Sequence, residues 1–448
     1  MTLSYISELQ AFLKEKQIIT DPVLTQKLSR DCYWYSPILD EELKDMKADA
    51  VVIPENLEEI EQIFAIAFEH KQPVLFKGSA TGNYGQIVPL QGGILIDTKL
   101  LNKIIEINPG EVRVEPGVKI GMLEKTLREN GQELCIFPST YLKATAGGFV
   151  SGGSGGIGSI TWGNLWDGNV IELTILTMEE KPNKLTISGD ELLNYIHSYG
   201  TTGFIAEIVF RTSEKTEWIQ QIISFENLDD SLRFSEKLAY ASSIQKRSVS
   251  TCEWPIPSYF KPLSKFIQEG KHVVIIEINE EASDELQRLV EEWNGEVTYT
   301  ILAEKYHKGL TLSDYTWNHT TLWALNANEQ MTYLQASFDL NRYIEQVALI
   351  QEQFKDEFYQ HFDWMRMDGK VVPQSIPLVR FSTKERLDEM VRFCESIGIK
   401  IFNPHTYLLE AGGWEAHISS VLRTKGKNDP RALLNPGKIR VTLSEIVN

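Results

Sequence analysis

The feature that most constrains the fold is a cluster of glycines near the end of the first third of the chain. Seven of the twelve residues from Gly147 to Gly158 are glycine, and apolar side chains such as Phe149, Val150 and Ile157 stand between them. Glycine tracts are usually flexible linkers, but linkers seldom carry such side chains. We therefore expect an ordered backbone. Because glycine has no Cβ, its successive N–H groups can converge on an anion without a lysine.

A Rossmann fingerprint is a second interpretation of this cluster, because Gly153-Ser-Gly155-Gly-Ile-Gly158 fits G-x-G-x-x-G. That motif needs a preceding strand, a helix that opens at the third glycine and an acidic residue about 20 positions later. The following stretch, 159–168, has two more glycines and no helical period. The sequence therefore disfavours a Rossmann domain.

Two other segments are also rich in glycine. The segment 76–85 follows a predicted strand and contains three glycines, but it lacks the Gly-Lys-Ser/Thr of a Walker A loop. The segment 199–207 places two glycines just before a predicted strand at 204–210. Each segment could be a plain turn. Three of them in one domain favour a site that holds a doubly charged pyrophosphate through peptide N–H groups.

Composition and charge exclude several classes of protein. Hydrophobic residues make up 42% and charged residues 24% of the 448 residues, as in an ordinary folded protein of two or three domains of about 150 residues each. The 44 Lys and Arg against 62 Asp and Glu give a net charge of −18, which repels a nucleic-acid backbone. We expect no nucleic-acid partner.

The cysteines and the amino terminus indicate a compartment. The four cysteines lie far apart and have no metal-ligand spacing, so we expect them to be reduced. The chain shows no secretory pattern at its start and no run of about 18 apolar residues that would cross a membrane. We therefore predict a cytoplasmic protein.

Hydrophobic patterning predicts an α+β fold with two main domains. Residues 1–45 have helical spacing and form a lead-in. Residues 46–212 alternate short strands with helices, beginning with a strand at 50–54, a helix at 57–70 and a strand at 73–76. Residues 213–425 contain longer helices and strands in the β-α-β-β-α-β succession of a ferredoxin-like layer. No internal repeat is visible in the sequence.

The order of these segments resembles the FAD-binding domain of the vanillyl-alcohol oxidase and p-cresol methylhydroxylase (PCMH) family, including glycolate oxidase subunits. The resemblance covers about residues 46–212 and 429–438, and it includes Pro138-Ser-Thr140 and Leu434-Asn-Pro-Gly-Lys438. It implies a PCMH-type FAD-binding domain of two subdomains at 46–212. It also implies a ferredoxin-like substrate or cap domain at 213–425 and a return of residues 426–448 to the FAD-binding domain.

The resemblance implies a set of residues that bind FAD, most of them in the glycine-rich segments. They are Lys77, Gly78, Ser79, Ala80, Thr81, Gly82, Tyr84, Gly85, Pro138, Ser139, Thr140, Thr145, Gly147, Gly148, Ser151, Gly152, Gly153, Gly158, Ser159, Gly203, Phe204, Ile205, Asn435 and Lys438.

Two departures from the family pattern matter. Many members attach the flavin covalently to a histidine in the first loop, but residues 76–85 contain no histidine or cysteine, so we expect noncovalent FAD. The glycolate-oxidase and D-lactate-dehydrogenase branch binds a metal through an H-x-G-D-G-N-x-H-like motif. This motif is missing here, and Asn403-Pro-His405 occurs without the rest of it. We expect no metal, and the substrate stays open.

Candidate catalytic residues should come from the second domain. Flavin oxidation needs a base for the hydroxyl proton and often a cation for a substrate carboxylate. His319, in a segment of aromatic residues, is one candidate base, and Arg366 and Arg380 are candidate cations. A cluster bounded by Pro and Gly adds His405, Tyr407 and Glu410. A purely structural role is the alternative for each.

Taken together, the sequence predicts an FAD-dependent oxidoreductase that oxidises a small alcohol or 2-hydroxy acid by hydride transfer to flavin N5. One alternative is an FAD-binding subunit of a multi-subunit oxidase without turnover of its own. Others are an oxidase of a sugar or an aromatic alcohol, and redox-neutral chemistry of the alkyl-glycerone-phosphate synthase type. The expected partners are a small-molecule substrate and a redox partner subunit.

Overall fold

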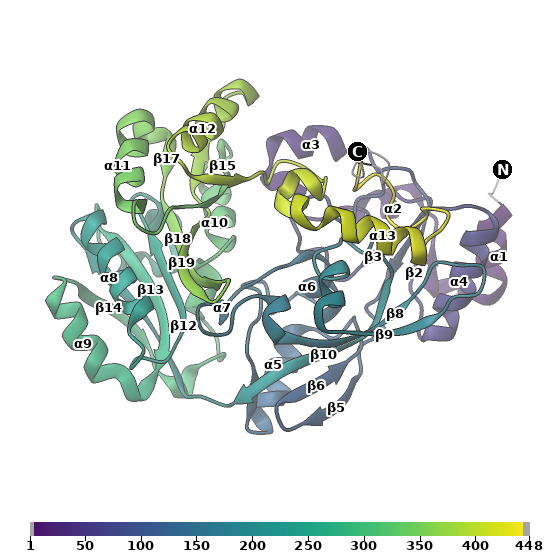
Figure 1. Cartoon of the computed structure of the whole chain (residues 1–448), viewed down its shortest axis with the longest axis horizontal. Helices are drawn as coiled ribbons and strands as arrows, with labels where there is room; N and C mark the ends of the chain where they lie inside the picture. Colours follow the sequence, from purple (N-terminus) through teal and green to yellow (C-terminus); the bar gives the residue numbers. More distant parts are fainter. Residues whose placement is uncertain (1–3, 442–448) are drawn as a thin grey trace.

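The computed structural model describes residues 4–441 (Figure 1). Its first sheet has the strand order β1-β2-β4-β3. The strands are β1 (Ile18–Ile19), β2 (Ala50–Val52), β3 (Val74–Lys77) and β4 (Ile94–Asp97). Strands β2, β4 and β3 are parallel, and β1 pairs antiparallel with β2. The predicted strands at 50–54 and 73–76 are therefore confirmed.

Helix α4 (Leu57–Glu69) connects β2 to β3 and confirms the helix predicted at 57–70. The side chain of Asn56 accepts a hydrogen bond from the backbone N–H of Glu59 and so caps its first turn. An apolar stripe that includes Phe64 is buried against the sheet. Helix α1 (Ser4–Phe12) packs beside α4 at the right of Figure 1, and the short α2 (Pro22–Leu28) and α3 (Pro37–Leu43) follow.

The second sheet has the order β5-β6-β10-β8-β9, and β7 pairs with the far end of β10. The elements of this layer are β5 (Ile104–Asn108), β6 (Glu111–Val114), α5 (Ile120–Glu129), β7 (Gln132–Leu134), α6 (Ala146–Gly152), α7 (Ser159–Trp162), β8 (Val170–Leu176), β9 (Lys184–Ser188) and β10 (Phe204–Glu214). Helix α6 therefore covers the first half of the glycine-rich stretch 147–158 that the sequence predicts to be ordered, and α7 follows directly after it.

Residues 218–402, which we call the cap, form an eight-stranded antiparallel sheet with helices at the left of Figure 1. Its first half consists of β11 (Trp218–Phe225), α8 (Leu228–Tyr240), β12 (Lys246–Cys252), β13 (His272–Asn279), α9 (Ser283–Glu292) and β14 (Glu296–Ile301). The strand order β14-β11-β13-β12 confirms the predicted ferredoxin-like succession.

The second half of the cap repeats this topology, although the sequence shows no repeat. It consists of β16 (Gln335–Ser337), α11 (Tyr343–Phe354), β18 (His361–Met367), β19 (Lys370–Ser375), α12 (Lys384–Ser396) and β21 (Lys400–Phe402), in the order β18-β19-β16-β21. The two halves join where β12 pairs with β18, with Ser250 opposite Asp363. The cap is thus two ferredoxin-like units fused along one pair of strands.

Both faces of the cap sheet are buried, because alternate residues of each strand enter different cores. On β13, Val274 and Ile276 face the core made with helices α8, α9 and α11, whereas Val273 and Ile275 face the core with helix α10 (His319–Ala327). A three-stranded sheet of β15 (Met331–Tyr333), β20 (Leu378–Arg380) and β17 (Phe358–Tyr359) lies beside α10.

After the cap, helix α13 (Ile418–Asn428) returns to the first half of the molecule (Figure 1). The Asn428 side chain donates hydrogen bonds to the hydroxyl of Tyr195 at 2.9 Å and to the carbonyl of Thr202 at 3.0 Å. The domain boundary predicted at residue 425 falls inside this helix, and the extreme ends of the first and last predicted ranges lie outside the described residues. Within 4–441, no helix is both long and apolar enough to cross a membrane.

A buried arginine joins the cap to the first half. Arg247, on β12, is 0% exposed and donates hydrogen bonds to the carbonyl of Leu134 and to the hydroxyl of Tyr306. The carboxylates of Glu124 and Glu133, from α5 and β7, each lie 3.5 Å from its guanidinium. Burial raises the pKa of Glu124 to about 7, and the charge of Arg247 opposes that rise.

Replacing Arg247 with Met should strongly destabilise the protein, because Glu124 and Glu133 would stay buried without this cation. Breaking one side of a buried ion network costs about 3–5 kcal/mol. We expect a clear fall in the midpoint of urea unfolding, followed by tryptophan fluorescence. In the control Arg113→Met, the lost pairs with Glu172 and Glu207 are partly exposed and should cost about 1 kcal/mol or less. Equal midpoints for the two variants would contradict this account.

Candidate functional site

One cavity is lined by both glycine-rich segments and by the cap. Of the residues predicted to bind FAD, it brings together Lys77, Gly78, Ser79, Ala80, Thr81, Gly82, Tyr84, Pro138, Ser139, Thr140, Thr145, Gly147, Gly148, Ser151, Gly152, Gly153, Phe204 and Ile205. The loop at 76–85 and the segment 147–158 therefore share a single binding space, as the pyrophosphate prediction requires.

The loop at 76–85 packs so closely against neighbouring residues that side chains at Gly78 and Gly82 would collide with them. A Cβ on Gly78 would lie 2.0 Å from Oγ1 of Thr145, and one on Gly82 would lie 1.8 Å from Oε1 of Gln86. The Gln86 side chain donates a hydrogen bond of 2.8 Å to the carbonyl of Gly152 and so ties the loop to the segment. The glycines are needed for this contact, and the backbone is left bare toward the cavity.

The polar groups of this part of the cavity suit a pyrophosphate. Within the described residues, the hydroxyls of Ser79, Thr81, Ser139 and Ser151 make no hydrogen bond to protein, so they are available to a ligand. Lys77 is the lysine that lines the cavity, and burial lowers its pKa while nearby Asp97 opposes the change. Hydroxyls and backbone N–H groups are the donors that phosphate oxygens accept. The residues present therefore fit FAD.

Six of the residues predicted to bind FAD do not line the cavity but stand behind it. Gly158 donates its N–H to the carbonyl of Arg247 at 2.7 Å, and the Ser159 hydroxyl accepts from the N–H of Gly156 at 2.9 Å. Gly203 has no room for a side chain, since a Cβ would lie 2.4 Å from Cγ2 of Ile175. These residues shape the backbone, as do Gly85, Asn435 and Lys438.

Lys438 and Asp31 hold the end of the loop from opposite sides. The buried ammonium of Lys438 donates to the carbonyls of Gly85 at 2.6 Å and Val88 at 3.0 Å, whereas the Asp31 carboxylate accepts from the N–H of Ile87. Burial lowers the pKa of Lys438 to about 7 and raises the pKa of Asp31 to about 6, and the attraction between the two charges opposes both shifts. Asn435 adds hydrogen bonds to the carbonyls of Gln86 and Tyr199.

The cap contributes five residues to the cavity, which we call the cap wall: Trp317, Asn318, His319, Gln335 and Ile376. Tyr35, Asn83 and Tyr84 line it as well. Sequence reasoning identified His319 and Tyr84 among these. It missed the others because they come from five separate stretches of chain, at 35, 83, 317–318, 335 and 376, that no motif links.

A buried carboxylate supports the cap wall from behind. Trp317 has a φ of 51°, which is strained for a residue with a side chain. Its N–H donates to Oδ1 of Asp363 at 3.3 Å, and the other oxygen of Asp363 lies 3.3 Å from Nε2 of His361. Asp363 is 2% exposed. The sequence indicated Arg366 on this strand, β18, but the residue of the strand that contacts the cap wall is Asp363.

His319 begins helix α10 and is the predicted base that the fold brings to the cavity. Its Nδ1 lies 3.8 Å from Oδ1 of Asp314 and is buried without a hydrogen bond. Burial, together with the charge of Lys143, lowers the pKa of His319 to about 4. Burial raises the pKa of Asp314 to about 6. At neutral pH the imidazole is therefore uncharged and able to accept a proton.

The cluster predicted at residues 402–413 does not line the cavity. Nδ1 of His405 lies 2.7 Å from the Ser36 hydroxyl and Nε2 lies 2.9 Å from the carbonyl of Tyr333, so both ring nitrogens have partners. The Tyr407 hydroxyl accepts from Arg440, and the Glu410 carboxylate accepts from the backbone N–H of Arg440. The contacts of these side chains fix the return of the chain from the cap.

The two predicted cations also lie away from the cavity. Arg366 donates to the carbonyl of Gly369 at 2.9 Å in a separate surface hollow beside Lys246 and Lys370. Arg380 is exposed on β20, opposite Met331. Neither side chain is placed to hold a carboxylate in the cavity.

Two residues near the cofactor space come from unexpected parts of the sequence. His197 lines the cavity, with Nδ1 3.1 Å from the carbonyl of Gly153, and burial lowers its pKa to about 4. Cys32 packs against the first loop, since its N–H donates to the carbonyl of Gly82 and its thiol lies 3.8 Å from the carbonyl of Ala80. Burial raises the pKa of that thiol to about 11, and it does not line the cavity.

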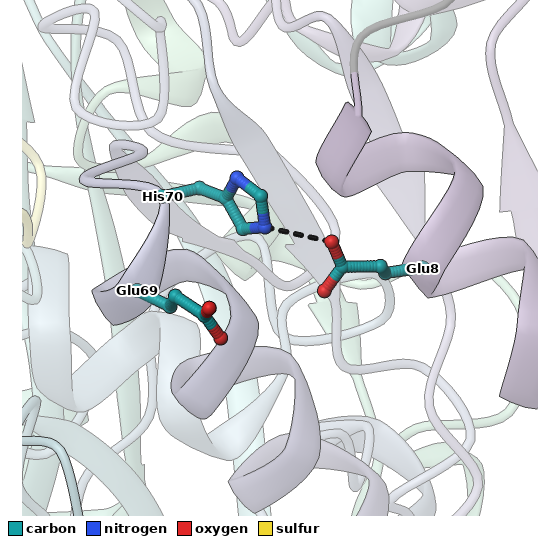
Figure 2. Close-up of side chains that lie close together, drawn as sticks. All are labelled: Glu8, Glu69 and His70. Carbon is teal, nitrogen blue, oxygen red and sulfur yellow. Dashed lines mark hydrogen bonds and ion pairs between the residues drawn. The ribbon is translucent and has the colours of Figure 1, made fainter.

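A group of metal-ligand residue types lies on the surface far from this cavity. Figure 2 shows Glu8, Glu69 and His70, whose ligand atoms lie within 4.8 Å of one another. His70 already has Glu8 at 2.8 Å on Nε2 and the Ser4 hydroxyl at 3.4 Å on Nδ1. These contacts explain the group as hydrogen bonds that link α1 to the end of α4.

Replacing Gly78 with Ala should weaken binding of FAD, the cofactor that the sequence predicts. The new Cβ would collide with Oγ1 of Thr145, which cannot turn away freely because it accepts the N–H of Gly148 at 3.3 Å. Such overpacking costs about 1–3 kcal/mol, or about 5- to 150-fold in affinity. FAD titration of the apoprotein measures the change. Gly412→Ala is the control, because the nearest atom to its Cβ lies 4.0 Å away, and equal affinities would contradict the assignment.

Comparison with known proteins agrees with this geometry. A family described as an FAD binding domain matches residues 48–183. The glycolate oxidase subunit GlcD of Bacillus subtilis is 29% identical over 191 residues, which are 40% of this chain and 40% of that protein. A D-lactate dehydrogenase of Anaerostipes hadrus is 30% identical over 195 residues, 41% of this chain and 40% of that protein. The chain thus aligns with about two fifths of these curated relatives.

A solved structure extends the likeness over almost the whole fold. Alkyldihydroxyacetonephosphate synthase matches with a TM-score of 0.72 over 97% of this chain and 84% of that chain, at 15% sequence identity. At this identity the match concerns the fold, including the cap. The match at 48–183 and the shared cavity show that this part of the chain is an FAD binding domain and that its cofactor is FAD.

Proposed function

We propose that this protein is an FAD-dependent oxidoreductase that oxidises the CH–OH group of a small alcohol or 2-hydroxy acid. The observation that carries the proposal is the single cavity between the glycine-rich segments and the cap wall, because its lining includes both the candidate base His319 and residues predicted to bind FAD. The relatives named glycolate oxidase subunit and D-lactate dehydrogenase support this type of substrate group.

The two sides of the cavity have different tasks in this proposal. The loop at 76–85 and the segment 147–158 hold the pyrophosphate of FAD through backbone N–H groups and hydroxyls. Bound FAD supplies a two-electron acceptor for the hydride that leaves the substrate carbon. The cap wall orients the substrate and keeps water away from it.

His319 takes the proton of the substrate hydroxyl, which leaves a carbonyl group in the product. Its Nδ1 is on the side of Asp314, at 3.8 Å, so that Nε2 is the nitrogen available to a ligand. The Asp314 carboxylate favours the tautomer with the proton on Nδ1 and stabilises the imidazolium that forms. The strained backbone at Trp317, held by Asp363, fixes the start of this helix.

A second candidate is an FAD-binding subunit without turnover of its own. The word subunit in the name of the GlcD relatives favours it, and it would need a partner chain as redox partner. The cytoplasmic localisation predicted from the sequence belongs to the same proposal. Activity of the isolated chain distinguishes the two candidates.

Anaerobic addition of alcohols and 2-hydroxy acids to the FAD-loaded protein tests the proposal. We expect at least one compound to bleach the flavin absorbance of the isolated chain. Replacing His319 with Gln should slow bleaching about 10²- to 10⁴-fold while FAD stays bound, because general-base catalysis contributes that much. No bleaching by any member of a broad panel would leave only the subunit candidate.

The pH dependence of bleaching tests the two assigned groups. Neutral His319 is the base, and its lowered pKa means that it stays neutral down to about pH 4. Asp314 is ionised only above about pH 6, so the rate should fall as the pH drops through that value. In Asp314→Asn the overall rate should be lower, and the fall in rate near pH 6 should disappear. A step that persists in the variant would exclude Asp314 from this role.

Precipitation with trichloroacetic acid tests the noncovalent attachment. We expect all yellow colour in the supernatant, because loop 76–85 has no histidine or cysteine and the Cys32 thiol has a raised pKa and does not line the cavity. The washed pellet should show no flavin absorbance, because denaturation releases a cofactor that is not covalently bound. A yellow pellet that turned colourless in Cys32→Ser would instead identify a covalent bond to that residue.

A further inference from the structure

We propose that the cavity binds an uncharged hydroxyl compound in preference to a free carboxylate. The neutral hydrogen-bonding groups of the cap wall make this selection. This inference rests on the proposed function and names the substrate class of that same site. It narrows the choice between an alcohol and a 2-hydroxy acid, and it derives from the side chains that the fold gathers opposite the glycine-rich segments.

The polar atoms on the substrate side are neutral, and several offer an acceptor. Oδ1 of Asn318 is buried without a hydrogen bond, and Nε2 of His319 is the ring nitrogen that is not on the side of Asp314. Gln335 donates to the Tyr84 hydroxyl at 2.5 Å, so this bond does not use the phenol proton of Tyr84. A hydroxyl compound both donates and accepts, so it can satisfy Asn318 and Tyr84 together. A carboxylate only accepts hydrogen bonds, so its oxygens would face the Asn318 oxygen with no proton between them.

The protonation of these groups supports the same conclusion. Burial raises the pKa of Tyr84 to about 12, so the phenol keeps its proton at neutral pH. Burial lowers the pKa of His319 to about 4, so the imidazole carries no positive charge there. Lys143, which contributes to that lowering, is exposed and does not line the cavity.

The charges around the cavity disfavour an additional anion. Of the described residues that line it, Lys77 is the fixed cation, and it lies in the FAD-binding part near Asp97. FAD brings two negative charges on its pyrophosphate, and the whole chain has a net charge of −18. A carboxylate buried against the cap wall would therefore lose its hydration without gaining a cation.

Apolar contacts complete the description of the substrate. The rings of Tyr35 and Trp317 and the side chain of Ile376 line the cavity beside the polar groups. Such surfaces bind the hydrocarbon or aromatic part of a small alcohol. The preferred substrate is thus a neutral compound with one hydroxyl group next to an apolar or aromatic body.

Matched pairs of probes that differ only in charge test this inference. Benzamide and benzoate are titrated against the oxidised holoprotein and followed by the change in bound-flavin absorbance, which needs no turnover. Mandelamide and mandelate are then compared as reductants in anaerobic bleaching. We expect the amide of each pair to be favoured at least about tenfold, because burying an unpaired charge costs more than about 1.4 kcal/mol.

A charge placed on the cap wall should reverse the preference. Ile376→Arg adds a cation to the cavity and should favour benzoate over benzamide at least about tenfold. Ile376→Met is the matched control of similar volume, and it should keep the preference for the amide. Gln335→Arg provides a second position in case the first variant does not retain FAD.

The outcomes separate this inference from the proposed function. Equal binding of the two probes, tighter binding of benzoate, or binding of neither by the wild-type protein would overturn the selection of neutral compounds. Preferential binding of benzamide without bleaching by any alcohol would support the inference on the ligand class and overturn the proposed oxidation. Bleaching by mandelate but not by mandelamide would overturn the inference alone.

Discussion

Arg247 is the residue through which the two halves of the molecule are held in a fixed relation. Its guanidinium enters the first half and meets Glu124, Glu133 and the carbonyl of Leu134, while its own carbonyl accepts the N–H of Gly158. One residue thus anchors the cap and also the end of the glycine-rich segment. A buried charge network of this kind favours one fixed arrangement of the two halves, because any displacement leaves a charge unpaired.

The cofactor side of the cavity relies on dipoles more than on charges. Gly78 and Gly82 let the loop touch Thr145 and Gln86, and the exposed peptide groups and free hydroxyls face the ligand. The charged pair of Lys438 and Asp31 does not face the cavity and instead fixes the loop that supplies those dipoles. A strongly acidic protein can in this way hold an anionic dinucleotide with little positive charge of its own.

Local patterns predicted much of this structure, and contacts between distant segments account for what they missed. Strands β2 and β3, helix α4, the first ferredoxin-like unit and the shared cavity follow from periodicity and glycine spacing. The fused second unit and the roles of Asn318 and Asp363 could not be predicted, because they depend on contacts between segments that no local pattern links, such as the hydrogen bond from Trp317 to Asp363. His405 lies in a segment rich in loop signals, yet Ser36 and Tyr333 occupy its ring nitrogens.

The pairing of β12 with β18 has a mechanical consequence for the site. Arg247 stands on one of these strands and Asp363 on the other, and the register that sets Ser250 opposite Asp363 fixes the spacing between the anchor of the cap and the support of Trp317. A slip by a single residue would turn every side chain of one strand to the opposite face. The pairing of β12 with β18 therefore sets the distance between the cap wall and the glycine-rich segments.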